Sequence, residues 1–376
     1  MREMISESRY LVHLLRCAIR DEQPQELPQS LSFGKVFSLG RAHSVENIAY
    51  YSVSKLDRKP EAALYREWEL RCNMALTRDV NQSFAREEIL DAFAQAGIRC
   101  LEVQGTKIKP FYPQPEYRTM ADLDFIIDRE NLGKAWQLLE ELGYECEDNH
   151  GVEVDAFRAP NINIEVHSEY FPASSAYHTV MRPPFASVEE TGAYDVNELY
   201  IYNILHIAKH YFKKGCGLRQ VLDVYYLNRH YGPVLNREYV ASVFQKAGVV
   251  EFAEKLSALA EHWFGDGPFR EDLEEMEAYL LSSGVNGNRY NHLNNELKAM
   301  QNQGIRCFRL KYSLKRIFVG KTYLYGRYPI TKKWKILLPF SWVYRLFAFV
   351  TPGGRRRLRQ ELGILTKSDW KQEKNV

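Results

Sequence analysis

The sequence predicts a mixed α+β protein in which a small mixed sheet with helices is flanked by helical regions. Apolar residues recur at three- and four-residue spacing before residue 98 and after residue 191, whereas short apolar runs separated by turns fill the stretch between. A chain of 376 residues is also too long for one typical compact core. We therefore expect four parts: a helical region at 1–97, a core at 98–190, a helical domain at 191–304 and a basic, aromatic-rich region at 305–376.

The composition excludes several classes of protein. Hydrophobic residues make up 45% and charged residues 26%, which is ordinary for a folded protein and excludes disorder throughout. The first residues lack the small-residue cleavage site of a signal peptide. The most apolar run, at 336–350, contains Pro339 and Arg345 and is too short to span a bilayer. We therefore expect a cytoplasmic protein.

The N-terminal 97 residues are predicted to be mostly helical. Tyr10, Leu11, Leu14, Leu15 and Ile19 form one apolar stripe, and helical spacing returns at 44–56 and 61–96. No catalytic constellation is visible there. The interpretation is a helical layer that covers another part of the protein.

The core is predicted to alternate strands with a helix. Its expected strands are Ile98–Val103, Asp122–Ile127, Tyr144–Glu147, Val152–Phe157 and Asn161–His167, and its expected helix is Asn131–Leu142, followed by Gly143 as a stop. The last strand alternates cleanly, which places Glu165 and His167 together on its polar face. Strands mixed with a helix over about 90 residues are typical of a compact α/β or α+β unit.

Helical spacing returns after the core. The expected helices are 195–214, 218–229, 237–264 and 270–281, and the stretch from Ser282 to Tyr290 is an expected loop. These helices complete the predicted helical domain.

Two carboxylates stand at the head of the second predicted strand. Because side chains alternate along a strand, Asp122 and Asp124 point the same way, while Leu123 and Phe125 point into the core. Paired carboxylates repel each other unless a cation lies between them, and hard oxygen ligands of this kind suit Mg²⁺. The same pair alone is also typical of a solvated strand start, so the motif by itself is weakly specific.

The stretch from Gln104 to Asp124 carries a resemblance to a known family. Its Gly105 turn, Tyr112-Pro113, Arg118, Asp122 and Asp124 resemble a bacterial nucleotidyltransferase family of largely uncharacterised proteins within the polymerase-beta-like superfamily. The resemblance continues through Gly143-Tyr144, Glu165, His167, His206, His210, Gly217, Arg219 and Asp223. It implies that residues 98–190 form a polymerase-beta-like nucleotidyltransferase core.

The resemblance implies transfer of a nucleoside monophosphate from a nucleoside triphosphate, ATP first, to an acceptor that the sequence does not identify. Such transfer uses Mg²⁺, with Mn²⁺ as an alternative, to neutralise the triphosphate and activate the attacking oxygen. Asp122 and Asp124 are the expected metal ligands and catalytic residues. Glu165 is the expected third carboxylate and the base for the acceptor, with Asp155 as the competing third ligand.

Phosphate-binding groups are expected near the glycine turn. Backbone N–H groups at Gly105 and the Thr106 hydroxyl are candidates, with Lys107, Lys109 and Arg118 as nearby cations. Arg118 has the alternative of pairing with a neighbouring acid. By the resemblance, His206, His210 and Arg219 wall the nucleotide or acceptor pocket; the histidines lie four residues apart in HIAKH, which lacks the glutamate of a zinc HExxH site.

The C-terminal region concentrates positive charge. Of the 50 Lys and Arg residues, 15 lie between residues 305 and 360, where none of the 48 Asp and Glu residues occurs. Cations interleaved with aromatic residues suit an anionic membrane surface at its cytoplasmic face, or packing against the acidic body. Nucleic acid is the less favoured partner.

Gln104 stands where the resemblance implies a lysine before the glycine, and Thr106 stands where other superfamily members have serine. The alternative function is therefore a catalytically inactive relative that acts as a binding or accessory protein. A further alternative is a peripheral membrane-associated assembly factor whose C-terminal region carries the function.

Overall fold

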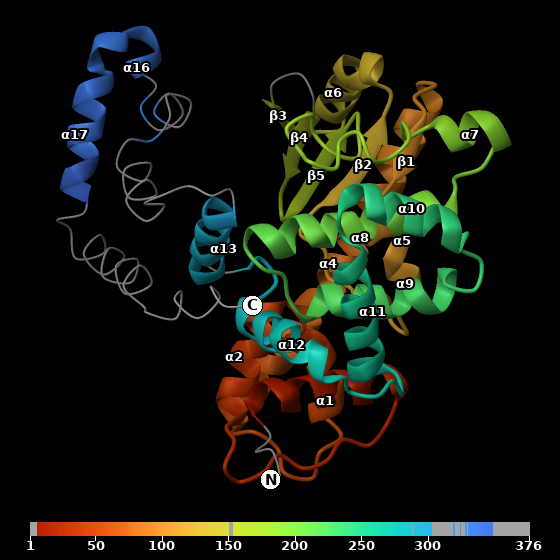
Figure 1. Ribbon diagram of the computed structural model, residues 1–376, viewed down its shortest axis with the longest axis vertical. Coiled ribbons are helices and arrows are strands. Elements are labelled where there is room, and N and C mark those ends of the chain that lie inside the picture. The colour runs from red at the N-terminus through yellow and green to blue at the C-terminus, as the bar shows by residue number, and fades with distance from the viewer. Residues whose placement is uncertain are drawn as a thin grey trace. The chain divides into compact units, whose positions relative to one another are not determined.

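The computed structural model describes residues 6–149, 153–287 and 289–302, together with residues 319, 324, 328 and 330–348 (Figure 1). The chain divides into two compact units: Met1–Tyr211 with Cys216–Asn286, and Phe212–Gly215 with Gly287–Val376. Helices surround one five-stranded sheet, which confirms the predicted mixed α+β class. The four-part division remains a prediction.

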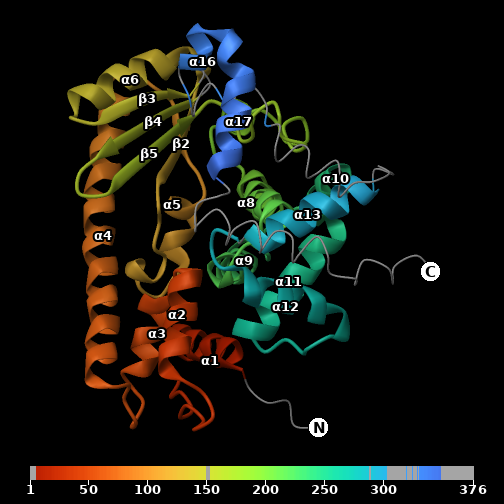
Figure 2. The ribbon, with the colours of Figure 1, turned by 90° about the vertical axis from the view of Figure 1, so that its left-hand side faces the viewer.

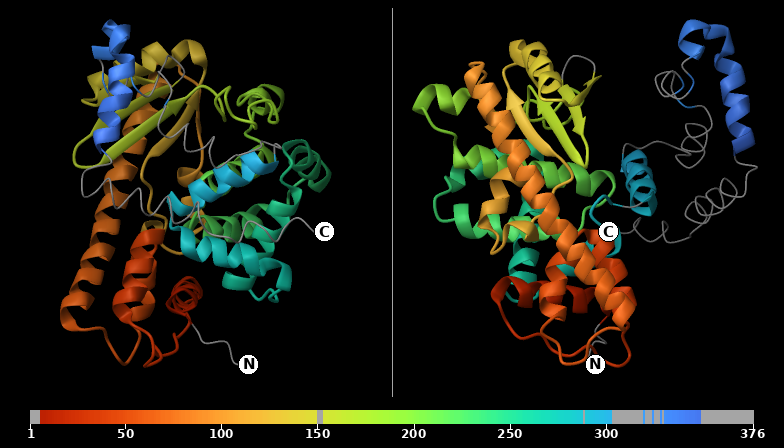
Figure 3. Two further views of the ribbon diagram at one scale, coloured as in Figure 1. Left: turned by 60° about the vertical axis from the view of Figure 1, so that its left-hand side comes forward. Right: turned by 180° about the vertical axis from the view of Figure 1, so that it is seen from behind.

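Helices precede the sheet, as the apolar spacing predicts: α1 (Glu7–Arg20), α2 (Phe33–His43), α3 (Glu46–Val53) and α4 (Ala62–Gln95). Ser6 caps α1 by accepting a hydrogen bond of 3.3 Å from the backbone N–H of Arg9. The 34-residue α4 runs from the N-terminal helices to the sheet (Figures 2 and 3). This helix therefore links the N-terminal layer to the site-bearing core.

The sheet is mixed. Its strands are β1 (Cys100–Glu102), β2 (Leu123–Ile127), β3 (Glu145–Asn149), β4 (Glu153–Arg158) and β5 (Ile162–His167). They follow the order β1-β2-β5-β4-β3, in which β2 and β5 are parallel and the other neighbours are antiparallel. Each lies within two or three residues of a strand that the apolar pattern predicts.

One face of the sheet packs against α4 and α6 (Leu132–Glu141). Phe93 of α4 meets Phe125 of β2 edge-to-face at 6.3 Å between ring centroids, and both side chains are fully buried. The alternate residues of β2 and β5 face the other way, toward the core built by the other helices. Apolar packing against α4 and α6 therefore fixes β2 and β5 in place, and these strands carry the polar residues on the opposite face of the sheet.

Short segments connect these elements. The link from β1 to β2 contains α5 (Gly105–Ile108) and the 3₁₀ turns Lys109–Phe111 and Pro115–Tyr117. The 3₁₀ turn Arg129–Asn131 leads into α6, and α7 (Ala186–Thr191) follows β5. Gly143 after α6 takes a positive φ of 81°, which suits glycine and agrees with the predicted stop.

The helices after the sheet in the first unit are α8 (Val196–Lys213), α9 (Leu218–Tyr231), α10 (Arg237–Ala247), α11 (Val250–Phe264) and, after a 3₁₀ turn at Glu271–Leu273, α12 (Glu274–Ser283). The helical structure predicted at 237–264 is confirmed, and it is divided into two helices because the chain breaks between α10 and α11. Gly248 has a φ of 68° there, a left-handed conformation that ends α10. The apolar spacing continues across this break, which is why the pattern did not reveal it.

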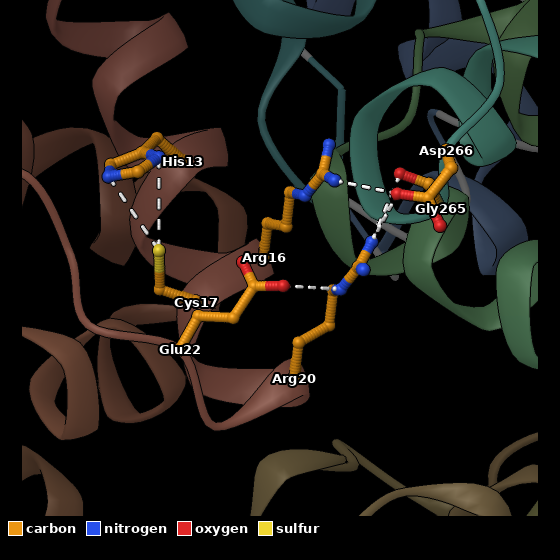
Figure 4. Close-up of polar contacts among 7 residues, drawn as sticks. All are labelled: His13, Arg16, Cys17, Arg20, Glu22, Gly265 and Asp266. Carbon is orange, nitrogen blue, oxygen red and sulfur yellow. Dashed lines mark hydrogen bonds and ion pairs between the residues drawn. The ribbon is translucent and has the colours of Figure 1, made fainter.

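Arginines of α1 bind the end of α11 (Figure 4). Arg20 donates to the carbonyl of Gly265 at 3.3 Å and to the Asp266 carboxylate at 2.8 Å, and Arg16 donates to Asp266 at 3.0 Å. Cations at a helix C-terminus satisfy carbonyls and interact favourably with its dipole. These contacts join segments about 250 positions apart in the sequence.

The described helices that begin in the second unit are α13 (Arg289–Asn302), α16 (Ile330–Lys333), the 3₁₀ turn Lys335–Leu337 and α17 (Leu338–Ala348). The indole of Trp342 in α17 donates to the carbonyl of Val319 at 3.1 Å. Most of the predicted basic region at 305–376 lies outside the described residues. Among the helices that are described, none has both the length and the apolar character needed to cross a bilayer.

Candidate active site

Asp124 and Glu165 lie opposite each other on the neighbouring parallel strands β2 and β5. The same register pairs Phe125 with Val166, and both of these side chains are buried in the core under α4 and α6. Because side chains alternate, the two carboxylates emerge on the other face. Asp124 is 4% exposed, while Glu165 is only partly buried. The sheet thus presents a buried carboxylate beside an accessible one.

Asp124, Glu165 and His167 form a group that could hold a metal, since one ligand atom of each lies within 4.8 Å of the others. The sequence prediction named Asp122 in place of His167. Asp122 immediately precedes β2, and burial together with the charges of Asp124 and Glu165 raises its pKa to about 7. The three predicted carboxylates therefore interact electrostatically, and the imidazole adds a nitrogen ligand. Carboxylate oxygens suit Mg²⁺, while added imidazole also suits Mn²⁺ and other transition metals.

Asp155, the competing third ligand, is opposite Glu165 on β4. Burial and the charges of Glu165 and Glu153 raise the pKa of Asp155. It is not a member of the group whose ligand atoms converge among the described residues. The geometry therefore favours Glu165 over Asp155.

His167 is surrounded by carboxylates. Its Nδ1 lies 3.0 Å from Glu153, and its Nε2 lies 3.6 Å from Asp124 and 3.5 Å from Glu165. Burial alone would lower the pKa of His167, but the contacts with the carboxylates of Asp124, Glu153 and Glu165 outweigh it and raise the pKa well above its ordinary value. A protonated His167 therefore balances part of the negative charge when no metal is bound.

Gln104 contacts the buried aspartate directly. Its side-chain amide donates to Oδ1 of Asp124 at 2.8 Å. Its backbone has φ 53° and ψ −124°, a conformation that L-residues rarely adopt. Such conformations cost about 1–3 kcal/mol and persist where the surroundings impose them. Gln104, which stands where the resemblance implies a lysine, is thus built into the site.

Gly105 and Thr106 form the first turn of α5 beside β2. A Cβ added to Gly105 would lie 2.6 Å from the Met120 sulfur, so a larger residue there would force the buried Met120 side chain to move. The Thr106 hydroxyl donates to the carbonyl of Val103 at 2.9 Å. Packing thus accounts for the glycine, and the hydroxyl oxygen retains acceptor capacity.

Arg118 is held in a buried ion pair. Its Nε and Nη2 donate to the two carboxylate oxygens of Asp223 at 2.7 and 2.9 Å, and the Tyr112 hydroxyl donates to the same carboxylate at 2.7 Å. Bidentate pairs of this kind fix geometry strongly. Arg118 therefore anchors the loop before Asp122 to α9. The arginine thus pairs with an acid, which was the alternative to phosphate binding that its sequence position allowed.

The other predicted cations are placed differently. Lys107 lies 3.4 Å from Glu102, and Lys109 pairs with Asp79. Arg219, in the first turn of α9, donates to the carbonyl of Thr119 at 2.9 Å. Burial and the charge of Arg118 lower the pKa of Arg219 to about 10.

A cavity of about 270 Å³ opens beside the carboxylates, lined by residues that include Gln104, Glu165, His167, Tyr202 and His206. His206 stacks on Tyr202 with an interplanar angle of 5° and shares a 2.9 Å hydrogen bond with His210. Burial, together with His210 and Lys209, lowers the pKa of His206 well below its ordinary value. The two predicted histidines therefore form a hydrogen-bonded pair at the cavity, in which His206 is neutral.

Two residues of the site escaped sequence reasoning. Glu153 reaches His167 because β4 pairs with β5 in a register that places these residues opposite each other. Tyr202 lies on α8, where its apolar neighbours made it look like an ordinary core residue. Alternation along β4 could have predicted the face of the strand on which Glu153 lies. It could not predict that β4 pairs with β5, which is what brings Glu153 to His167.

Comparison with known protein families assigns most of the chain to a family. A family model described as uncharacterised nucleotidyltransferase matches residues 29–265, which is more than half of the chain. The matched region extends from just before α2 through α11 and contains the whole sheet. No curated protein sequence and no solved structure matches the chain.

Proposed function

Because the chain belongs to the uncharacterised nucleotidyltransferase family, we propose that it transfers a nucleoside monophosphate from a nucleoside triphosphate to an acceptor hydroxyl or similar nucleophile. The supporting observation is the register that sets Asp124 opposite Glu165, with Asp122 on the approach to the same strand. ATP is the first candidate for the nucleotide. The working cation is Mg²⁺, with Mn²⁺ as the alternative.

In this proposal Asp124 and Glu165 hold the cation, and the His167 nitrogen is available as a further ligand. Asp122, whose charge interacts with those of Asp124 and Glu165, adds a third carboxylate from the approach to β2. A bound divalent cation would supply charge neutralisation for the phosphate oxygens. Glu165 is only partly buried, which leaves its carboxylate open to accept a proton from the acceptor. The acceptor oxygen forms a bond to the α-phosphorus while the bond to the leaving pyrophosphate breaks, and the acceptor proton goes to Glu165.

The remaining predicted residues have supporting roles in the proposal. Gly105, Thr106 and Lys107 lie on α5, at the turn next to Asp124, where they can approach the phosphates. Arg118 positions the loop before Asp122 through Asp223. His206 and His210 form part of the pocket wall for the nucleotide or the acceptor.

Calorimetry with ATP, GTP, CTP and UTP, each with and without Mg²⁺, tests this proposal. We expect one or more nucleotides to bind in the presence of Mg²⁺, and intact mass spectrometry on the same mixtures would reveal self-modification. Failure of all four nucleotides to bind would overturn the proposal and favour an accessory protein. Binding with no dependence on Mg²⁺ would favour a catalytically inactive relative.

We also propose that the region at 305–360 contacts an anionic membrane surface, at the cytoplasmic face. In its described part Trp334 is 57% and Phe340 is 67% exposed, and Lys333 and Lys335 are exposed beside them. Exposed aromatic residues among cations suit the boundary between headgroups and acyl chains. Flotation with phosphatidylcholine vesicles, with and without phosphatidylserine, should carry the full chain only when the anionic lipid is present. Unchanged flotation of a Trp334→Ser, Phe340→Ser variant would contradict the idea.

A further inference from the structure

A second cavity, of about 160 Å³, lies beside the loop that leads into Asp122. Three arginines line it: Arg71 and Arg78 of α4 and Arg219 of α9. Arg71 and Arg78 are seven residues apart on one helix, which puts them on the same side two turns apart. The cavity also reaches Thr119, three residues before Asp122.

The arginines of this cavity have hydrogen-bonding capacity left over. The Nε atoms of Arg71 and Arg219 are buried and have no hydrogen-bond partner among the described residues. Arg71 reaches Glu67 only at 4.0 Å, and Arg219 uses one Nη on the Thr119 carbonyl. Buried polar groups in folded proteins are normally satisfied, so unpaired guanidinium N–H groups indicate a missing partner.

The charge of the cavity is positive. Glu46 is the carboxylate that lines it, against three guanidinium groups. Glu46 interacts electrostatically with Arg71 and Arg78, so one carboxylate offsets only part of the charge of the three guanidinium groups. By contrast, the cavity beside Gln104 and His167 has three carboxylates among its lining residues, those of Glu153, Glu165 and Glu169, together with Lys209. The excess of guanidinium groups over carboxylates in the arginine-lined cavity therefore attracts phosphate oxygens.

We propose that the cavity lined by Arg71, Arg78 and Arg219 binds the oxygens of a phosphate or diphosphate group. Guanidinium groups match these oxygens with paired N–H donors. The phosphate could belong to the nucleotide or to a phosphorylated acceptor. Assigning it to either rests on the proposed transferase function, whereas anion binding itself does not. The proposal gives α4 of the N-terminal helical layer a direct role in ligand binding.

Calorimetric titration of the full chain with pyrophosphate, in buffer with EDTA, tests anion binding apart from any metal. We expect the wild type to bind and Arg71→Gln, Arg78→Gln to weaken binding by about tenfold or more, through loss of charge-assisted hydrogen bonds. Arg66→Gln is the matched control, because Arg66 is exposed on the same helix and does not line the cavity. No binding by the wild type, or equal binding by the double variant, would overturn the proposal.

Competition identifies the source of the phosphate. If ATP displaces pyrophosphate, the cavity takes the phosphates of the nucleotide; if both bind together, that assignment fails and the cavity belongs to a phosphate on the acceptor. Asp124→Asn should still bind pyrophosphate in EDTA. If nucleotides fail to bind in the presence of a metal, the transferase function is contradicted but the proposed anion site is not. If pyrophosphate fails to bind, the proposed anion site is contradicted but the transferase function is not.

Discussion

Asp124 of β2 and Glu165 of β5 are directly paired in a parallel register, although 41 positions separate them in the sequence. Strands β3 and β4 lie between them along the chain but pair on the far side of β5. The carboxylates meet because β5 inserts beside β2. This pairing is the structural basis for each expectation about the site.

Glu165 rather than Asp155 should act as the third carboxylate. Glu165→Gln should weaken Mn²⁺ binding by about tenfold or more, because it removes a charged ligand from the group with Asp124 and His167. Asp155→Asn is the matched control on the neighbouring strand and should change the affinity far less. Titration with MnCl₂ measures both. A larger effect from Asp155→Asn would reverse the assignment.

Gln104 should support the metal site through Asp124. Gln104→Leu removes the amide that donates to Oδ1 of Asp124, and loss of such an outer contact should reduce Mn²⁺ affinity by about tenfold. Leucine has about the same free-energy cost as glutamine at this positive φ, because both are L-residues with a Cβ. The substitution therefore leaves the backbone strain at position 104 nearly unchanged. Gln245→Leu, on the exposed side of α10, is the control. Wild-type affinity in Gln104→Leu would show that the amide is not needed.

Asp223 should be critical for stability. Asp223→Asn leaves the buried Arg118 guanidinium without its carboxylate, and breaking a buried pair typically costs about 3–5 kcal/mol of unfolding free energy. Urea unfolding measures this loss. Asp266→Asn, which breaks exposed ion pairs to Arg16 and Arg20, should leave the midpoint nearly unchanged. Equal midpoints for the two variants would contradict this difference.

His43 should make stability depend on pH. Its Nδ1 accepts from the backbone N–H of Leu218 at 3.2 Å, and its Nε2 lies 3.3 Å from the Leu281 carbonyl, so the neutral ring is satisfied at both nitrogens. Burial lowers its pKa from 6.5 to about 4. Between these values the unfolded chain binds a proton that the folded chain does not. The contribution of His43 to the free energy of unfolding is therefore greatest above pH 6.5. It falls by about 1.4 kcal/mol per pH unit as the pH drops from 6.5 toward 4.

Urea unfolding of the wild type and His43→Leu at pH 7.5, 6.0 and 5.0 isolates this contribution. The difference in unfolding free energy between the two proteins should shrink as the pH falls, since only the wild type carries the buried imidazole. Other titrating groups act on both proteins and cancel in the difference. A difference that stays constant with pH would contradict the assignment.

Alternation along single strands was sufficient to predict which side chains share a face. It placed Asp122 with Asp124, and Glu165 with His167, on polar faces, and it predicted the burial of Leu123 and Phe125 that the structure shows. Alternation is a local property of each strand. Strand order is not local, so the pairing of β2 with β5 and the approach of Glu153 to His167 could not be predicted this way.

The roles of the arginines also depend on distant contacts. Arg118 resembles a phosphate ligand in sequence, yet its partner is Asp223, 105 residues away. Arg71 and Arg78 lie in a region whose helical spacing gave no sign of a site, and only the packing of α4 brings them to one cavity with Thr119 of the loop before Asp122. A pattern in the chain shows what a residue can bind, while the fold determines what it reaches.

The most direct test of the metal-dependent site is electron paramagnetic resonance of Mn²⁺ bound to the full chain in the presence of ATP. The wild type should bind Mn²⁺ and ATP together, and Asp124→Asn should lose most of that bound Mn²⁺ while remaining folded, because the buried ligand between Gln104 and His167 is gone. Wild-type Mn²⁺ binding by Asp124→Asn would contradict the account.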